Sequence, residues 1–150
     1  MKGSEVTQVV VFKLSDEIYA IDIFDVREIV EEKKITKIPN VPEYIDGILD
    51  LRGEITTVVN LKKLLNIPEK DGRTKGKIIV IDADKDVGTV GFIVDTVLSV
   101  TEVDSIEPLS TIASTSAISL DESYIKGIIK GKEKLIILLD VDAILKKVSK

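Results

Sequence analysis

Three aspartates in the middle of the chain have the type and spacing of metal ligands. Asp82, Asp84 and Asp86 alternate as the oxygen ligands of a calcium loop do. The pattern then fails, because the sixth position is Val87 where such a loop needs Gly, and the twelfth is Ile93 where it needs a bidentate Glu. We interpret this stretch as a solvated hairpin turn.

Other residues that could support catalysis lack the partners they would need. The sequence has no His and no Cys, so the commonest general base, thiolate chemistry and disulfides are excluded. The hydroxyls of Ser110–Ser119 therefore have no His to activate them, and the basic stretch Gly72–Lys77 does not have the spacing of a phosphate-binding loop. The sequence predicts a protein that is not an enzyme and has no cofactor.

Charge and hydropathy limit the possible partners and location. The net charge of −5 and the pI near 4.9 argue against a nucleic-acid binder, which needs a basic face. No run of 18 apolar residues is present, and the N-terminal MKGSEVTQ lacks the apolar segment of a signal peptide. We expect a cytoplasmic protein that does not insert into a membrane.

The elements that position these side chains are mainly strands. Aromatic residues make up only 4% of the chain, so Val, Ile and Leu must form the core. Apolar runs separated by turn residues predict strands at 6–14, 17–23, 26–32, 45–51, 55–61, 77–81, 87–94, 97–102, 125–130 and 135–139. Short helices are expected after Asn60 and Asp140, both good N-caps, and the polar Glu69–Gly76 is the expected boundary.

The stretch Tyr44–Leu61, which reads YIDGILDLRGEITTVVNL, predicts a tight hairpin. Its two apolar runs are joined by Arg52-Gly53-Glu54, so Arg52 should be exposed at a strand end and held stiffly by the hairpin. Two interpretations are open at this point. Arg52 either keeps a turn soluble or docks a partner.

The sequence also contains an internal repeat. Residues 47–65 align without a gap onto residues 127–145, so that Asn60 falls on Asp140 and Arg52 on Lys132. A second register, offset by 71, places Val26 on Val97 and Ile29 on Val100. Because neither copy could bury a strong core alone, the repeat predicts two small five-stranded β-barrels that share an apolar interface. We expect approximate subdomains at 12–76 and 77–140, with the N-terminal strand and the C-terminal helix able to cross between them.

Four apolar residues related by the repeat are candidates for a binding groove. If some of Val26, Ile29, Val97 and Val100 face outward, they would line a surface suited to an amphipathic helix. The alternative is that all four belong to the core, since side chains on a strand alternate between its two faces.

Four segments resemble the CheW-like adaptor proteins of bacterial and archaeal chemotaxis, and the likeness covers nearly the whole chain. They are YAIDIFDVREIV (19–30), GILDLRGEITTVVNL (47–61), VGFIVDTVLSV (90–100) and GIIKGKEKLIILLDVDAIL (127–145). The Leu-Arg-Gly turn before Val-Val-Asn-Leu is the most specific part. Family members often carry Asn before this turn and Pro before the Val pair, where this chain has Asp50 and Thr57.

The resemblance implies two SH3-like barrels and a non-enzymatic adaptor that couples the cytoplasmic tips of chemoreceptors to the histidine kinase CheA. It also implies recruitment to membrane-associated receptor arrays. A free-standing regulatory domain of the CheA type, or a small-barrel ligand-binding protein, is the alternative. The positions that match partner-contacting or docking positions of the family, or that the repeat relates to them, are Arg52, Val26, Glu28, Ile29, Val97, Val100, Gly47 and Gly91.

Overall fold

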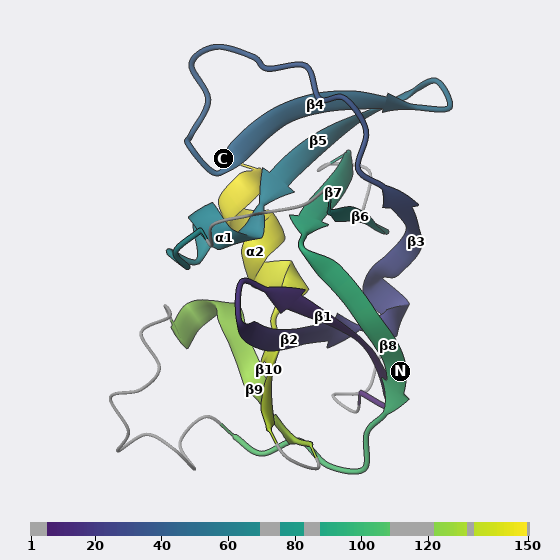
Figure 1. Cartoon of the computed structure of the whole chain (residues 1–150), viewed down its shortest axis with the longest axis vertical. Helices are drawn as coiled ribbons and strands as arrows, with labels where there is room; N and C mark the ends of the chain where they lie inside the picture. Colours follow the sequence, from purple (N-terminus) through teal and green to yellow (C-terminus); the bar gives the residue numbers. More distant parts are fainter. Residues whose placement is uncertain (1–5, 70–75, 83–87, 109–121, 132–133, 150) are drawn as a thin grey trace.

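The computed structural model describes residues 6–69, 76–82, 88–108, 122–131 and 134–149, and it is mainly β (Figure 1). The expected strands and both helices are present. In chain order the elements are β1 (Gln8–Leu14), β2 (Glu17–Asp22), η1 (Ile23–Asp25), β3 (Val26–Glu31), β4 (Ile45–Leu51), β5 (Glu54–Asn60), α1 (Leu61–Leu64), β6 (Lys77–Ile81), β7 (Thr89–Val94), β8 (Thr96–Glu102), η3 (Glu122–Tyr124), β9 (Ile125–Lys130), β10 (Leu135–Leu139) and α2 (Val141–Val148).

The strands form two five-stranded sheets. One sheet, here called barrel A, has the order β8-β1-β2-β10-β9, and the other, barrel B, has the order β3-β6-β7-β5-β4. In each sheet the segment that follows one edge strand reaches the opposite edge: Thr36 bridges to Ile48 on β4, and Glu107 bridges to Ile128 on β9. These two bridges close the sheets into small barrels.

Three apolar clusters make up the core. A small cluster fills each barrel, one around Val11 and Leu138 and the other around Val58 and Val80. The largest cluster lies between the barrels and takes side chains from both sheets, from α1 and from α2, with Phe12, Tyr19, Phe92 and Ile144 fully buried in it. The expected apolar interface is therefore present, and the C-terminal helix helps to cover it.

The repeat is visible bond by bond. The parallel pairing of Val58 with Gly91 in barrel B has its counterpart in Leu138 with Ala20 in barrel A, and the two barrel-closing bridges are related by the same offsets of 80 and 71. The amide of Asn60 donates to Tyr44, and the amide of Asp140 donates to Tyr124, again 80 residues apart. Both repeats therefore build the same set of elements in the same register.

The barrels do not divide where the repeats divide. The expected boundary at residues 76 and 77 falls inside barrel B, which takes β3–β5 from the first repeat and β6–β7 from the second. Barrel A takes β1–β2 from the first repeat and β8–β10 from the second. Each repeat therefore contributes two strands to one barrel and three strands to the other. Such an exchange is possible because strands from two copies of one sequence pattern can pair equally well within or between copies.

Several stretches that the sequence singled out lie outside the described residues. They are the aspartates at 84 and 86, most of the basic segment at 72–77, the hydroxyl cluster at 110–119 and Lys132.

Candidate functional site

The β4–β5 hairpin ends in a two-residue turn made by Arg52 and Gly53. Leu51 pairs with Glu54, and the φ angles of the two turn residues are 52° and 89°. Positive φ at both central positions is the geometry that matches the twist of a hairpin and that favours Asn and Gly. The carboxylate of Asp50 accepts a hydrogen bond from the amide of Gly53 at 2.7 Å, which fixes the turn. The predicted tight hairpin is confirmed.

The side chains of this turn form a charged cluster with the neighbouring strand β3. Arg52 donates to Glu28, and Arg27 donates to Glu54 at 3.0 Å. The Arg52 side chain remains 67% exposed, whereas Glu28 is 27% exposed. We call Arg27, Glu28, Arg52, Glu54 and Thr89 the Arg52 cluster. It holds the Arg52 guanidinium at the surface of barrel B, where Glu28 engages one side of the group and the side chain stays largely exposed.

Glu54 is tied into the cluster from a second side. The hydroxyl of Thr89 on β7 donates to its carboxylate. This hydrogen bond, followed by that from Arg27, holds the pKa of Glu54 below its usual range, because both stabilise the ionised form.

The four apolar candidates divide into two pairs. Val26 and Val97 are half-buried and pack against the large shared cluster. Ile29 and Val100 are exposed, at 38% and 52%. The alternative that all four are core is therefore wrong for the second pair, and one exposed residue stands on β3 of barrel B and the other on β8 of barrel A.

Gly47 and Gly91 are both buried positions of close approach. A Cβ on Gly47 would lie 2.2 Å from the carbonyl oxygen of Thr36, and the φ of Gly47 is 145°. A Cβ on Gly91 would lie 2.7 Å from Cγ2 of Ile78. Both glycines allow backbone and side chains to pack closely within barrel B, so they act inside the fold and offer no exposed side chain to a partner.

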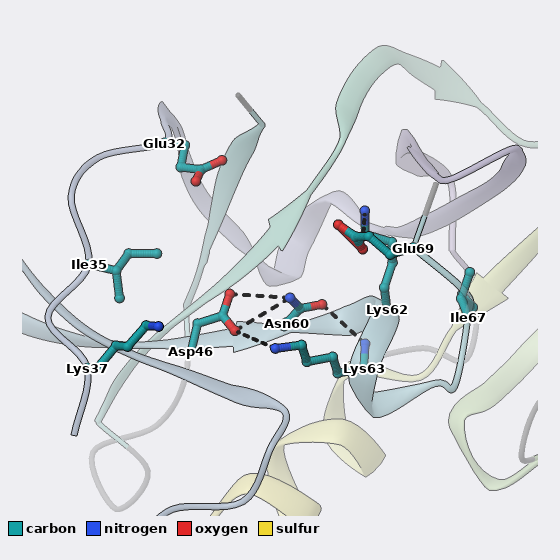
Figure 2. A pocket seen from close by; sticks show the side chains of 9 residues that line it. All are labelled: Glu32, Ile35, Lys37, Asp46, Asn60, Lys62, Lys63, Ile67 and Glu69. Atoms are coloured by element: carbon teal, nitrogen blue, oxygen red, sulfur yellow. Dashed lines mark hydrogen bonds and ion pairs between the residues drawn. The ribbon is translucent and has the colours of Figure 1, made fainter. Parts of the chain in front are cut away.

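A cavity of about 520 Å³ lies beside α1, and none of the residues that line it belongs to the Arg52 cluster (Figure 2). At its floor, Asn60 donates to Asp46 at 3.3 Å and Lys63 pairs with Asp46 at 3.7 Å. At its edge, Lys62 pairs with Glu69 at 2.9 Å. Its lining also includes Glu32, Ile35, Lys37 and Ile67. The three lysines face three carboxylates, so the cavity has no excess of either charge.

Some residues of these sites were not predicted from the sequence. Arg27 and Glu54 could have been found, because the neighbours Arg27 and Glu28 on β3 have the opposite charges to Glu54 and Arg52 of the hairpin. Thr89 and the buried Lys62 gave no such signal. Among the described residues there is no group of three or more His, Cys, Asp or Glu side chains that could hold a metal ion, and no helix is long and apolar enough to cross a membrane.

Comparison with known proteins identifies the fold and the family. The family model of the CheW-like domain matches residues 8–149. The chemotaxis protein CheW of Bacillus subtilis is 34% identical over 143 residues, covering 95% of this chain and 88% of that protein. That of Thermotoga maritima is 31% identical over 142 residues, covering 95% and 89%. The crystal structure of the scaffolding protein TtCheW from Thermoanaerobacter tengcongensis superimposes with a TM-score of 0.79 at 38% identity, covering 93% of this chain and 88% of that one.

The two-barrel fold, the family model and these relatives place the chain in the class of chemotaxis adaptors. The chain belongs to the CheW-like family.

Proposed function

We propose that the protein is a non-enzymatic adaptor that couples the cytoplasmic tips of chemoreceptors to the histidine kinase CheA. In this role it works in the cytoplasm and is recruited to receptor arrays at the membrane. The family match over residues 8–149 supports the proposal, together with the exposed Arg52 at the position of the family's Leu-Arg-Gly turn. Binding then involves surfaces and no chemical step.

The backbone of Arg52 is the observation that carries the proposal furthest. A non-glycine residue at a φ of 52° costs about 1 kcal/mol relative to Gly or Asn, which are preferred in this turn. The exposed ion pair with Glu28 returns well under 1 kcal/mol. Folding alone therefore does not favour Arg at this position, and strained residues on a rigid turn are typical of binding sites.

The remaining candidates fit the same role. Ile29 and Val100 offer exposed apolar surface that an amphipathic helix, such as a receptor tip, could cover. Val26 and Val97 support these strands from the core, and Glu28 orients Arg52.

The test replaces Arg52 by Asn, which suits the turn but lacks the guanidinium. We expect the melting temperature to stay equal or rise, because the backbone strain falls by more than the lost ion pair contributes. Affinity for a receptor tip fragment or for the CheA regulatory domain should fall about tenfold, which corresponds to about 1.4 kcal/mol. Isothermal titration against each fragment measures this.

The matched control is Lys126→Gln, which removes one exposed positive charge from β9 of barrel A. It should leave both affinities unchanged. A double variant, Arg52→Glu with Glu28→Arg, separates two roles for the arginine. If this variant binds as tightly as the unmodified protein, the ion pair between positions 28 and 52 matters more than the position of the guanidinium. Failure of the unmodified protein to bind either fragment would disprove the adaptor proposal.

A further inference from the structure

Among the described residues, the side chain of Lys62 is the most deeply buried charged group. It is 5% exposed and lies at the first turn of α1, where its ammonium donates to Asp95 at 2.7 Å and pairs with Glu69 at 2.9 Å. Lysine is rarely buried unless it is paired in this way. The pair therefore holds Lys62 and Asp95 at a fixed separation.

Asp95 stands at the point where the chain crosses from barrel B to barrel A, between β7 and β8. Its amide donates to the carbonyl of Lys13 at 3.1 Å, and its second carboxylate oxygen accepts from the amide of Ser15 at 2.7 Å. The hydroxyl of Ser15 in turn donates to the carbonyl of Pro68 at 2.6 Å. One carboxylate thus joins the β1–β2 turn of barrel A to α1 of barrel B.

The repeat does not account for this network. By the offset of 71, the residue equivalent to Asp95 is Phe24 at the other crossing, and it is 77% exposed. By the offset of 80, the residue equivalent to Lys62 is Asp142. An aromatic ring and a carboxylate cannot form this ion pair. The network belongs to only one of the two crossings that the duplication created.

We propose that Lys62 is a positioning residue which, through Asp95, locks the orientation of barrel B against barrel A. The apolar cluster between the barrels holds them together without fixing a direction, since burial of apolar surface is non-directional. Charge-assisted hydrogen bonds are directional and can select one orientation from several that the cluster permits. The lock sets the relation between β3 of barrel B and β8 of barrel A.

The consequence for binding rests on the adaptor function proposed above. The candidate contacts Ile29 and Val100 stand on different barrels, so a partner that touches both needs them at a fixed separation. Preorganising that separation removes a cost that the partner would otherwise bear.

The test measures the distance between the barrels directly. The sequence has no Cys, so Ile55→Cys on β5 and Leu135→Cys on β10 give two unique spin-label sites, both more than half exposed. In this background, Lys62→Met keeps an unbranched side chain, one heavy atom shorter, and removes its charge. We expect the distance distribution from pulsed electron resonance to broaden or shift, while the amide spectra of residues inside each barrel keep their chemical shifts.

Lys63→Met is the matched control, because Lys63 is the next residue of the same helix and pairs with Asp46 inside barrel B. It should leave the distance distribution unchanged. If Lys62→Met does not fold, Asp95→Asn is the second variant, since it leaves Lys62 its pair with Glu69 and should broaden the distribution in the same way. A folded Lys62→Met or Asp95→Asn variant with the distribution of the parent would overturn the proposal.

A binding measurement separates this proposal from the adaptor function. A partner that contacts both barrels should bind roughly threefold more weakly to Lys62→Met. The distance measurement needs no partner, so a broadened distribution with no partner binding in the parent would uphold the lock and disprove the adaptor role. An unchanged distribution with normal partner binding would do the reverse.

Discussion

The β4–β5 and β9–β10 hairpins occupy equivalent places in the two barrels, and they agree inside the fold while differing at its surface. Each hairpin has a glycine near its start, packed against the segment that closes the barrel, and each leads into a capped helix. At the turns the agreement ends. Glu54 of the first hairpin corresponds to Lys134 of the second, and Arg27 and Glu28 of β3 correspond to Leu98 and Ser99 of β8.

This difference separates the residues that pack inside the fold from the residues that face solvent. Residues that meet another backbone are shared by both repeats, because the same barrel geometry requires them. Residues that face solvent are free to differ: the charged Arg52 cluster is on barrel B, and Leu98, 46% exposed, is in the equivalent place on barrel A. A duplicated protein can in this way offer two distinct surfaces on one scaffold, which fits the adaptor role proposed above.

The largest expected effect is on stability, at the equivalent glycines of the two hairpins, Gly47 and Gly127. A Cβ at Gly47 would meet a backbone carbonyl at 2.2 Å in a residue with a φ of 145°, so Gly47→Ala should lower the free energy of unfolding by about 3 kcal/mol or more. A Cβ at Gly127 would meet the Ile106 side chain at 2.4 Å and the Glu107 carbonyl at 2.9 Å, without a positive φ. Because the isoleucine can move, Gly127→Ala should cost about 2 kcal/mol.

Urea denaturation of both variants measures the difference. Gly53→Ala is the control for conformation alone, because its φ is 89° with open space around the Cβ, and it should cost about 1 kcal/mol. Equal losses at positions 47 and 127 would mean that the two barrel-closing bridges pack equally tightly against the glycines and that the hairpins do not differ there.

An intermediate effect is expected at the helix caps. Asn60 and Asp140 each accept from the amide three residues on, at 3.1 Å. Asn60 is buried and also donates to Asp46, so Asn60→Asp would place a carboxylate against a carboxylate and should cost about 2 kcal/mol. Asp140→Asn keeps the cap bond and loses only the favourable interaction with the helix dipole, which is worth a few tenths of a kcal/mol.

Thermal unfolding of the two exchanges at neutral pH tests this. The two losses should converge in acid, because protonation removes both the repulsion at position 60 and the dipole interaction of Asp140 that Asp140→Asn loses. A stability loss at position 60 no larger than that at position 140 would show that Asp46 does not repel a carboxylate at the cap position.

Local signals in the sequence were enough to predict the strands, both caps, the tight turn and the repeat. They could not predict the exchange of strands, because pairing within a repeat and between repeats satisfies the same alternation of apolar residues. They also did not separate Val26 from Ile29, although a spacing of three on a strand places side chains on opposite faces and could have done so.

The buried network was beyond sequence reasoning for a different reason. A lysine just after an N-cap is typical of a solvated helix, and nothing near Lys62 indicates that Asp95, 33 residues later, will reach it. Burial of a charge depends on a partner that only the tertiary structure supplies.

The smallest effect, and the sharpest contrast between the hairpins, lies in the titration of Glu54. Thr89→Val removes the hydroxyl that contributes most to lowering its pKa, so that pKa should rise toward its ordinary value, with a smaller rise for Arg27→Ala. A carboxylate with a lowered pKa stabilises the fold above its unfolded pKa and loses that contribution as the pH falls through the folded value. The stability difference between the parent and Thr89→Val should therefore be larger at pH 7 than at pH 3.

Carbon-13 NMR of the Glu54 carboxyl follows the pKa directly, and Thr57→Val on the same sheet is the matched control. An unchanged titration of Glu54 in Thr89→Val would mean that the hydroxyl does not hold the carboxylate and that the turn is fixed by Arg27 and Asp50 alone. The residue equivalent to Glu54 in barrel A is Lys134, which has no carboxyl to titrate in this way. A pH dependence of stability that follows the titration of Glu54 therefore reports on the charged surface of barrel B. It does not report on the packing that the two repeats share.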